Sequence, residues 1–203
     1  MQLSAVILAG GQSKRMGQDK AWVRHQGKAL IELAVEKVQA LGIQDTLISG
    51  RLGQDYSSLS CSVLVDSEFG LGPMAGIEQG LRVAKSSLVL VLPVDLPGMT
   101  VECLRKLLRC CDRLTGALAK LHGQIEPLVA VYPKHCHEYA IMNVARGDYS
   151  VQHFAYACWH GGAIRIFRVP ESHAPCFANC NTQEDLAEFN NRSGPAVGEP
   201  RNP

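Results

Sequence analysis

The chain has 203 residues, of which 46% are hydrophobic and 19% charged, a balance typical of one globular domain. Lys and Arg total 20 against 19 Asp and Glu, so the net charge is +1. A general nucleic-acid-binding protein normally has a marked basic excess, so any anion site here must be local. No apolar run is long enough to cross a membrane, and no basic segment precedes the first apolar run. We therefore expect no signal peptide and a cytoplasmic protein.

Strands and helices alternate in the first half of the sequence. Short apolar runs predict strands, and apolar residues at helical spacing predict helices. The expected strands are 4–9, 45–49, 62–66 and 87–95; the expected helices are 29–42, 74–85 and a segment from Thr100 to about Cys111. The run 87–95 is the most hydrophobic, so we expect this strand at the centre of the sheet, covered on both faces.

The second half is less regular. Its pattern predicts strands within 116–132, around a turn at 122–124, and at 163–169. Helices are expected over 134–145, from Ser150 and from Thr182, where Asp185 suggests a capping box. The domain is expected to span 1–189, and the tail 190–203, rich in Gly, Pro and Asn, is expected to be disordered.

The alternation implies a single three-layer α/β domain with a mostly parallel, Rossmann-like sheet and right-handed crossovers. Ligands of such sheets bind at the carboxyl ends of the strands. The loops 10–20, 66–73 and 93–98 should therefore meet in one crevice. The residues expected around that common space are Gly10, Gly11, Lys20, Asp66 and Asp95.

The loop after the first strand is suited to a polyphosphate. Its two glycines permit backbone amides to approach an oxyanion closely, although the loop is neither a Walker A loop nor a G-x-G-x-x-G motif. Lys20 is a point cation suited to a phosphate, and Arg15 offers a planar fork. Asp95 is a hard oxygen ligand of the kind that Mg²⁺ prefers.

Eight cysteines raise the question of a metal or disulfide site. No two have the C-x-x-C spacing of common zinc sites, and the only tight His/Cys cluster is His135, Cys136 and His137. Adjacent residues rarely converge on one ion. We therefore expect reduced, mostly buried thiols.

Four motifs in order carry a resemblance to a known family, and the likeness covers most of residues 4–189. They are LAGGQSKRMGQDKA (8–21), VDSEFGLGPMAGI (65–77), PVDLP (93–97) and NCNTQEDL (179–186). With them the chain resembles the molybdopterin-guanine dinucleotide synthase family, the molybdenum cofactor guanylyltransferases. The resemblance implies a fold of the nucleotide-diphospho-sugar transferase type.

It also implies transfer of GMP from GTP to molybdenum-molybdopterin, release of pyrophosphate, and delivery to other molybdenum cofactor proteins and apo-molybdoenzymes. The implied nucleotide-binding residues are Leu8, Ala9, Gly10, Lys20, Asp66 and Asp95. Asp95 would also hold Mg²⁺, and the implied catalytic residues are Arg15, Lys20 and Asp95. The family often has asparagine where this chain has Ser49, so that nucleotide contact is not carried over.

Two other functions remain open. A cytidylyltransferase for the same cofactor would share nearly every motif and tends to carry alanine at the position of Gly10. A non-catalytic nucleotide-binding carrier would have little need of Asp95.

Several residues also have a purely structural interpretation. Asp66 and Asp95 could be caps at strand ends, and Lys14 and Lys20 could be solvated loop lysines, an interpretation that we adopt for Lys14. Asn179 and Asn181 could order the last helix or contact the metal or acceptor. Glu126 could be a surface charge or face the acceptor. Six histidines are expected to be structural or solvated: His122, His135, His137, His153, His160 and His173.

Overall fold

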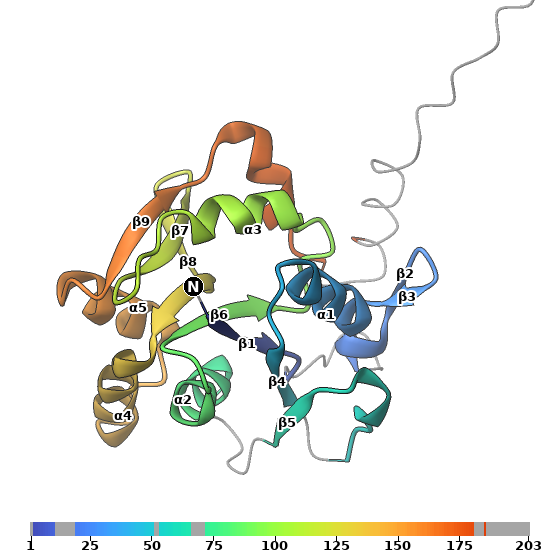
Figure 1. Ribbon diagram of the computed structural model, residues 1–203, viewed down its shortest axis with the longest axis horizontal. Coiled ribbons are helices and arrows are strands. Elements are labelled where there is room, and N and C mark those ends of the chain that lie inside the picture. Colours follow the sequence, from blue (N-terminus) through green and yellow to red (C-terminus); the bar gives the residue numbers. More distant parts are fainter. Residues whose placement is uncertain (1, 11–18, 51–52, 66–71, 181–184, 186–203) are drawn as a thin grey trace, which may run out of the picture.

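A seven-stranded sheet lies between two layers of helices (Figure 1). The structure, a computed structural model, describes residues 2–10, 19–50, 53–65, 72–180 and 185. The strand order is β5-β4-β1-β6-β8-β7-β9. The strands are β1 (Leu3–Leu8), β4 (Asp45–Gly50), β5 (Ser62–Val65), β6 (Leu88–Pro93), β7 (Gly116–Leu121), β8 (Gln124–Pro133) and β9 (Ile164–Arg168).

The first four of these strands are parallel, as the alternation with helices predicts. β1 pairs with both β4 and β6, and β4 pairs with β5. β8 is antiparallel to β6 and to β7, while β9 is again parallel to β7. The reversal comes from the hairpin between β7 and β8, where His122 and Gly123 have φ angles of 47° and 85°. A two-residue turn with two positive φ angles matches the twist of the strands that it joins.

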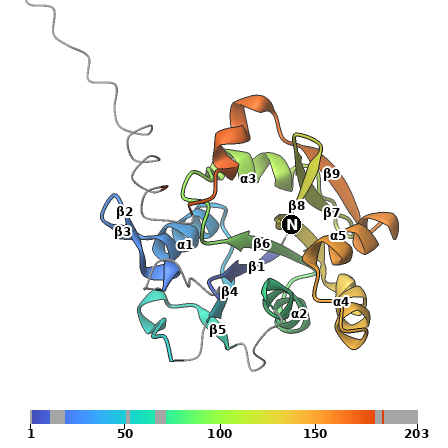
Figure 2. The same cartoon turned by 180° about the vertical axis from the view of Figure 1, so that it is seen from behind.

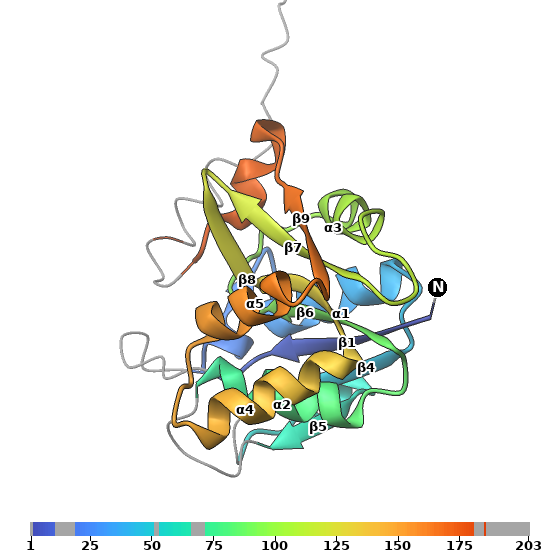
Figure 3. The ribbon, with the colours of Figure 1, turned by 90° about the vertical axis from the view of Figure 1, so that its left-hand side faces the viewer.

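The helices are divided between the two faces of the sheet (Figures 2 and 3). The helices α1 (Leu30–Ala40) and α3 (Val101–Leu108) cover one face. The other face is covered by α2 (Pro73–Val83), α4 (His137–Ala145) and α5 (Val151–His160). Each face has its own apolar core, and the three-layer prediction is confirmed.

Alternation along the central strands feeds both cores. In β1, Ala5 and Ile7 lie in the core under α1 and α3, whereas Val6 and Leu8 lie in the other. β6 is the middle strand of the seven, and all six of its residues are buried. Its central, doubly covered place is therefore confirmed. No helix in the described ranges has the length and apolar character that a membrane span requires.

Helix ends follow local sequence signals. The Thr100 and Ser150 side chains accept hydrogen bonds from the amides of Cys103 and His153, so both residues cap helices as expected. The helix expected over 134–145 begins with the 3-10 turn η3 (Lys134–Cys136). The capping box at Thr182 and the tail 190–203 lie outside the described residues.

Short elements were missed because they are too brief to give a periodic pattern. They are the hairpin β2 (Arg24–His25) with β3 (Lys28–Ala29), and the 3-10 turns η1 (Lys20–Trp22), η2 (Ser57–Leu59) and η4 (Glu171–Phe177). All eight cysteines are free thiols and five of them are buried, so the expectation of mostly buried thiols is confirmed.

Candidate functional site at the carboxyl ends of β1 and β6

The order of the strands places a crevice between β1 and β6. The chain leaves β1 for its neighbour β4 on one side and later returns through β6 on the other side. Ligands of open α/β sheets bind outside the carboxyl ends of the strands at such a reversal. Leu8, Ala9 and Gly10 end one strand here, and Asp95 follows the other. The amide of Val94 donates to the carbonyl of Leu8 at 3.2 Å, which joins the two strand ends.

The end of β1 is fixed by hydrogen bonds to β4. The amides of Ala9 and Gly10 both donate to the carbonyl of Ser49, at 2.8 and 2.9 Å. In this structure a sheet carbonyl already accepts the proton of the Gly10 amide, so the approach of this amide to an oxyanion stays a prediction. Leu8 and Ala9 are 6% and 3% exposed, so their side chains belong to the core. Only their backbone is suited to contact a nucleotide.

Ser49 marks a close approach between β4 and α2. Its side chain is buried, and a Cβ added at Gly76 would lie 2.7 Å from the Cβ of Ser49 and 2.9 Å from Cδ2 of Leu8. The lack of a side chain at Gly76 therefore permits the first turn of α2 to pack against the ends of β1 and β4. The space beside Ser49 is already filled by this packing.

Lys20 and Asp95 meet across the crevice. Lys20 Nζ donates to Asp95 Oδ2 at 3.1 Å, and the two side chains are 14% and 27% exposed. Asp19 precedes this lysine and caps η1, because its side chain accepts from the amide of Ala21. The structure thus brings together two of the predicted charged residues, which are 75 positions apart in sequence.

The late motif also reaches Asp95. The amide of Cys180 donates to the carbonyl of Asp95 at 3.0 Å. Burial raises the pKa of the Cys180 thiol; the negative charge of Asp185 adds to this, and the positive charge of Lys20 opposes it. Asn179, next to Cys180, is exposed. The segment that carries the predicted Asn179 therefore lies beside Asp95, whereas the role of its side chain stays a prediction.

A lysine that the sequence analysis missed binds the same loop. Lys37 of α1 donates to the carbonyl of Leu96 at 3.2 Å and to that of Pro97 at 2.9 Å. The available signal was a lysine directly beside the apolar stripe of α1, between Ala34 and Val38. Cys180 gave no such signal, because its contact is made by a main-chain amide.

Glu126 lies at the same edge of the sheet. Ala130 of β8 pairs with Val91 of β6, so Glu126, four residues earlier in an antiparallel strand, extends toward the carboxyl end of β6. Burial raises the pKa of its carboxyl group. This position does not decide whether Glu126 is a surface charge or faces the acceptor.

Three of the predicted histidines have carboxylate partners outside this site. The rings of His122, His137 and His153 face carboxylates of Glu171, Glu78 and Asp148, at 3.2, 2.7 and 2.8 Å. These pairs agree with a structural role.

Several predicted residues lie outside the described part of the chain. They are Gly11, Lys14, Arg15, Asp66 and Asn181. Their proposed roles stay predictions.

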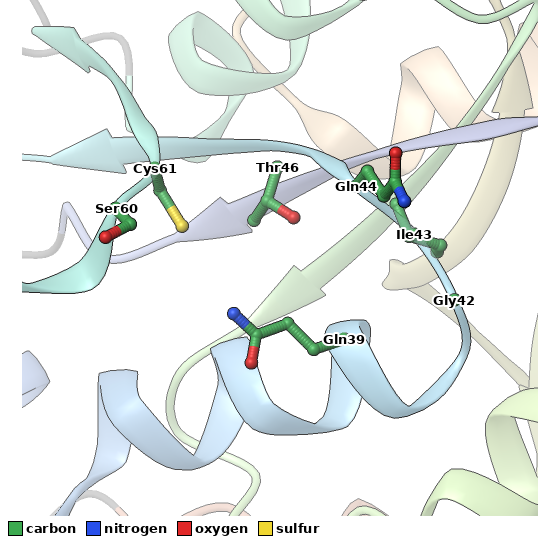
Figure 4. A pocket seen from close by; sticks show the side chains of 7 residues that line it. All are labelled: Gln39, Gly42, Ile43, Gln44, Thr46, Ser60 and Cys61. Atoms are coloured by element: carbon green, nitrogen blue, oxygen red, sulfur yellow. The ribbon is translucent and has the colours of Figure 1, made fainter.

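A hollow of about 330 Å³ lies at the opposite edge of the sheet (Figure 4). Its walls come from the end of α1 and from the beginnings of β4 and β5. Thr46, Ser60 and Gln39 line it, together with Gly42, Ile43, Gln44 and Cys61. None of these residues is charged, so the hollow has no cation to bind a triphosphate.

The site fits a magnesium ion only together with phosphates. Asp95 offers one partly exposed carboxylate, and the described residues contain no group of three His, Cys, Asp or Glu side chains that could hold a metal. Mg²⁺ typically takes one or two carboxylates plus phosphate oxygens and waters. A single aspartate at the open end of a strand meets that requirement.

Comparisons with known proteins agree with this geometry. The model of the MobA-like NTP transferase domain matches residues 5–192. A probable molybdenum cofactor guanylyltransferase from Opitutus terrae is 32% identical over 90% of this chain and 92% of its own. A molybdenum cofactor guanylyltransferase from Pseudomonas paraeruginosa is 34% identical over 91% and 93%.

A solved structure shows the same fold. It is molybdopterin-guanine dinucleotide biosynthesis protein A from Archaeoglobus fulgidus, with a TM-score of 0.72 and 24% identity. The match covers 93% of this chain and 97% of that one.

Proposed function

Because this chain belongs to the MobA-like NTP transferase family, we propose that it transfers GMP from GTP to molybdenum-molybdopterin and releases pyrophosphate. The observation that carries the proposal is the pairing of Lys20 with Asp95 where β1 and β6 end. One cation for phosphate and one carboxylate for a metal are what nucleotidyl transfer requires of a protein. Relatives more than 30% identical are named molybdenum cofactor guanylyltransferases, which supports the molybdenum cofactor as the acceptor.

The two charged side chains have separate roles in this proposal. Lys20 binds the triphosphate and stabilises the charge that develops on the departing pyrophosphate. Asp95 would hold Mg²⁺, which when bound neutralises phosphate charge and orients the reacting groups. Without nucleotide the two residues neutralise each other, so neither leaves an unpaired charge in a partly buried site.

The acceptor supplies its own nucleophile. A phosphate dianion is already competent to attack the α-phosphorus of GTP near neutral pH, so no protein base is needed. The protein contributes positioning and electrostatic stabilisation, which are the main sources of catalysis in phosphoryl transfer. The backbone at Leu8–Gly10, fixed by Val94 and Ser49, would form the rigid floor of the nucleotide site.

The test is a pyrophosphate assay with Mg²⁺, molybdopterin and either GTP or CTP. We expect pyrophosphate from GTP and much less from CTP. A preference for CTP would make the protein a cytidylyltransferase, and tight GTP binding without pyrophosphate would make it a carrier.

The matched variant is Asp95→Asn, which keeps nearly the same shape. We expect a folded protein whose turnover falls about a hundredfold or more, the loss typical of removing one electrostatic stabiliser. Near-normal turnover in this variant would contradict the metal role of Asp95.

A further inference from the structure

Lys37 lies under the loop that carries Asp95. It comes from α1, beside the buried apolar residues of that helix, and its ammonium group contacts the main chain directly after Asp95. Nζ is 3.2 Å from the carbonyl oxygen of Leu96 and 2.9 Å from that of Pro97. One side chain therefore binds two successive carbonyls of this loop.

The surroundings of Lys37 are unusual for a lysine. Burial lowers its pKa from 10.5 to about 8, while negative charge at Cys176 or Glu36 would act in the opposite direction. Among the described residues no carboxylate lies within ion-pair distance of Nζ, and this group donates to the two carbonyls. Burying a charge is costly unless polar groups replace water. The loop carbonyls do so here, and the loop is in turn held by a charged donor.

Besides the bond from Lys20 to the Asp95 side chain, the loop has few other attachments within the residues that the structure describes. Pro93 and Pro97 have no amide hydrogen to donate. Three main-chain hydrogen bonds hold it in the described part of the chain: from Val94 to Leu8, from Met99 to Leu96 and from Cys180 to Asp95. The bond of Val94 lies before the aspartate, and the bond between Met99 and Leu96 lies after it. The bond to Asp95 itself comes from Cys180, near the carboxyl end of the chain. Lys37 binds both of the residues that directly follow Asp95.

We propose that Lys37 is a positioning residue, which fixes the direction of the Asp95 carboxylate by holding the Leu96 and Pro97 carbonyls. This inference rests on the proposed function for the part that concerns metal and turnover. Lys37 touches neither nucleotide nor metal in it, and it acts only through the loop. Groups that orient a metal ligand typically change metal affinity or activity about 10- to 100-fold when they are removed.

The experiment compares Lys37→Met with Lys134→Met. Lys134 is a good control because it too is a half-buried lysine that donates to a main-chain carbonyl, that of Ala84, at 2.6 Å. This contact lies at the amino-terminal end of β6, at the other edge of the sheet from Asp95. Both variants lose a similar contact, but only Lys37→Met removes one from the Asp95 loop.

Two quantities are measured. The first is hydrogen–deuterium exchange of residues 94–99 without nucleotide, which we expect to quicken at least tenfold in Lys37→Met and to stay unchanged in Lys134→Met. The second is the Mg²⁺ concentration for half-maximal turnover, which we expect to rise about tenfold in Lys37→Met alone, with KM for GTP changing less. Lys37→Gln keeps an uncharged N–H donor group, so its exchange rate and Mg²⁺ requirement should lie between those of the wild type and of Lys37→Met. It carries the same test if the methionine variant does not fold.

Equal exchange of residues 94–99 in the wild type and in Lys37→Met would overturn the inference. So would faster exchange with an unchanged Mg²⁺ requirement, because the lysine would then order the loop without orienting Asp95. The exchange experiment needs no turnover, so it tests the anchoring of the loop even if the wild type transfers no GMP. Absence of pyrophosphate from the wild type contradicts the proposed function instead.

Discussion

Lys20 Nζ lies 3.1 Å from Asp95 Oδ2, a contact between the first motif of the chain and its third. The lysine follows the loop after β1, and the aspartate follows β6, so the parallel pairing of these two strands brings the charges together. Because both side chains are largely shielded from water, their interaction is stronger than that of an exposed pair. A bound triphosphate would compete for this lysine.

Replacing Lys20 by alanine tests which part of the nucleotide it meets. We expect Lys20→Ala to weaken GTP binding much more than guanosine binding, because the cation contacts phosphate and not base. Calorimetric titration of both ligands measures the two losses. Lys28→Ala is the control, since Lys28 pairs with Glu36 on the exposed surface. Equal losses of affinity for GTP and guanosine would show that Lys20 does not act through the triphosphate.

The close packing of α2 against the sheet predicts that a side chain added at either of two glycines of this helix will destabilise the fold. We expect Gly76→Ala and Gly80→Ala each to lower the free energy of unfolding by about 1–3 kcal/mol, because both would force a methyl group into packed atoms. The added Cβ meets Ser49 and Leu8 in the first case and Val6 in the second. Chemical denaturation measures both effects.

Only Gly76→Ala should also weaken GTP binding, because Ser49 holds the Ala9 and Gly10 amides and would have to shift. Val6 lies within β1, away from its carboxyl end. Equal GTP affinity in the two variants would show that the close approach at Gly76 serves stability alone.

Much of the fold could be predicted because its signals are local. The apolar run of β6 predicted a central strand, and Thr100 predicted a helix start. The family resemblance is likewise confirmed, since the MobA-like model matches residues 5–192. The turn at 122–124 predicted that β8 runs back along β7, and this is confirmed. The antiparallel pairing of β8 with β6 was not foreseen, because the residues of a strand do not show which distant strand it will pair with.

The site was only partly predictable, because a sequence shows side-chain chemistry but not the contacts that main-chain atoms make. Lys20 and Asp95 were found because side-chain chemistry and strand ends are visible in a sequence. The contacts of Lys37 with Leu96 and Pro97, and of Cys180 with Asp95, were not, because they use main-chain atoms that any residue possesses. The hydrogen bond of the Gly10 amide was not foreseen, because Ser49, its acceptor, lies on another strand.

Asp45 should make stability depend on pH in the acid range. Its carboxylate accepts from Ser4 Oγ at 2.5 Å and from the amide of Lys85 at 2.9 Å. Burial acts to raise its pKa, but these hydrogen bonds outweigh burial and leave the pKa below the usual 3.8. A lowered pKa in the folded state adds stability above the unfolded value, and this stability is lost as pH falls through the folded value.

We therefore expect Asp45→Asn to cost about 1–3 kcal/mol of unfolding free energy near pH 7. The difference from the wild type should shrink as the pH falls below about 4, because the carboxylate takes up a proton first in the unfolded chain and, at lower pH, in the folded protein. Denaturation at several pH values measures this gap. Glu102→Gln, which removes a largely exposed carboxylate paired with Lys106, should show little change at any pH. If the stability difference between Asp45→Asn and the wild type stays constant down to pH 2, the ionised Asp45 carboxylate is not what stabilises the fold.

The choice of base is tested at Gly10. If this residue lies under the edge of the base, its missing side chain leaves room for the larger purine. Gly10→Ala would add a methyl group there, and a misfit of that size costs roughly 1–3 kcal/mol in a tight pocket. GTP should suffer and the smaller CTP should not, so the ratio of the two kcat/KM values should fall about ten- to two-hundredfold.

Full inversion of the preference is not expected, because the donors and acceptors of guanine must also be matched by groups other than Gly10. The Gly10 amide, which donates to Ser49, is unchanged by the substitution, so the end of β1 should keep its place. Thermal unfolding of the variant checks this. If the variant is stable and the GTP to CTP ratio does not move, base selection lies elsewhere in the site. The preference for GTP over CTP would then rest on the family alone.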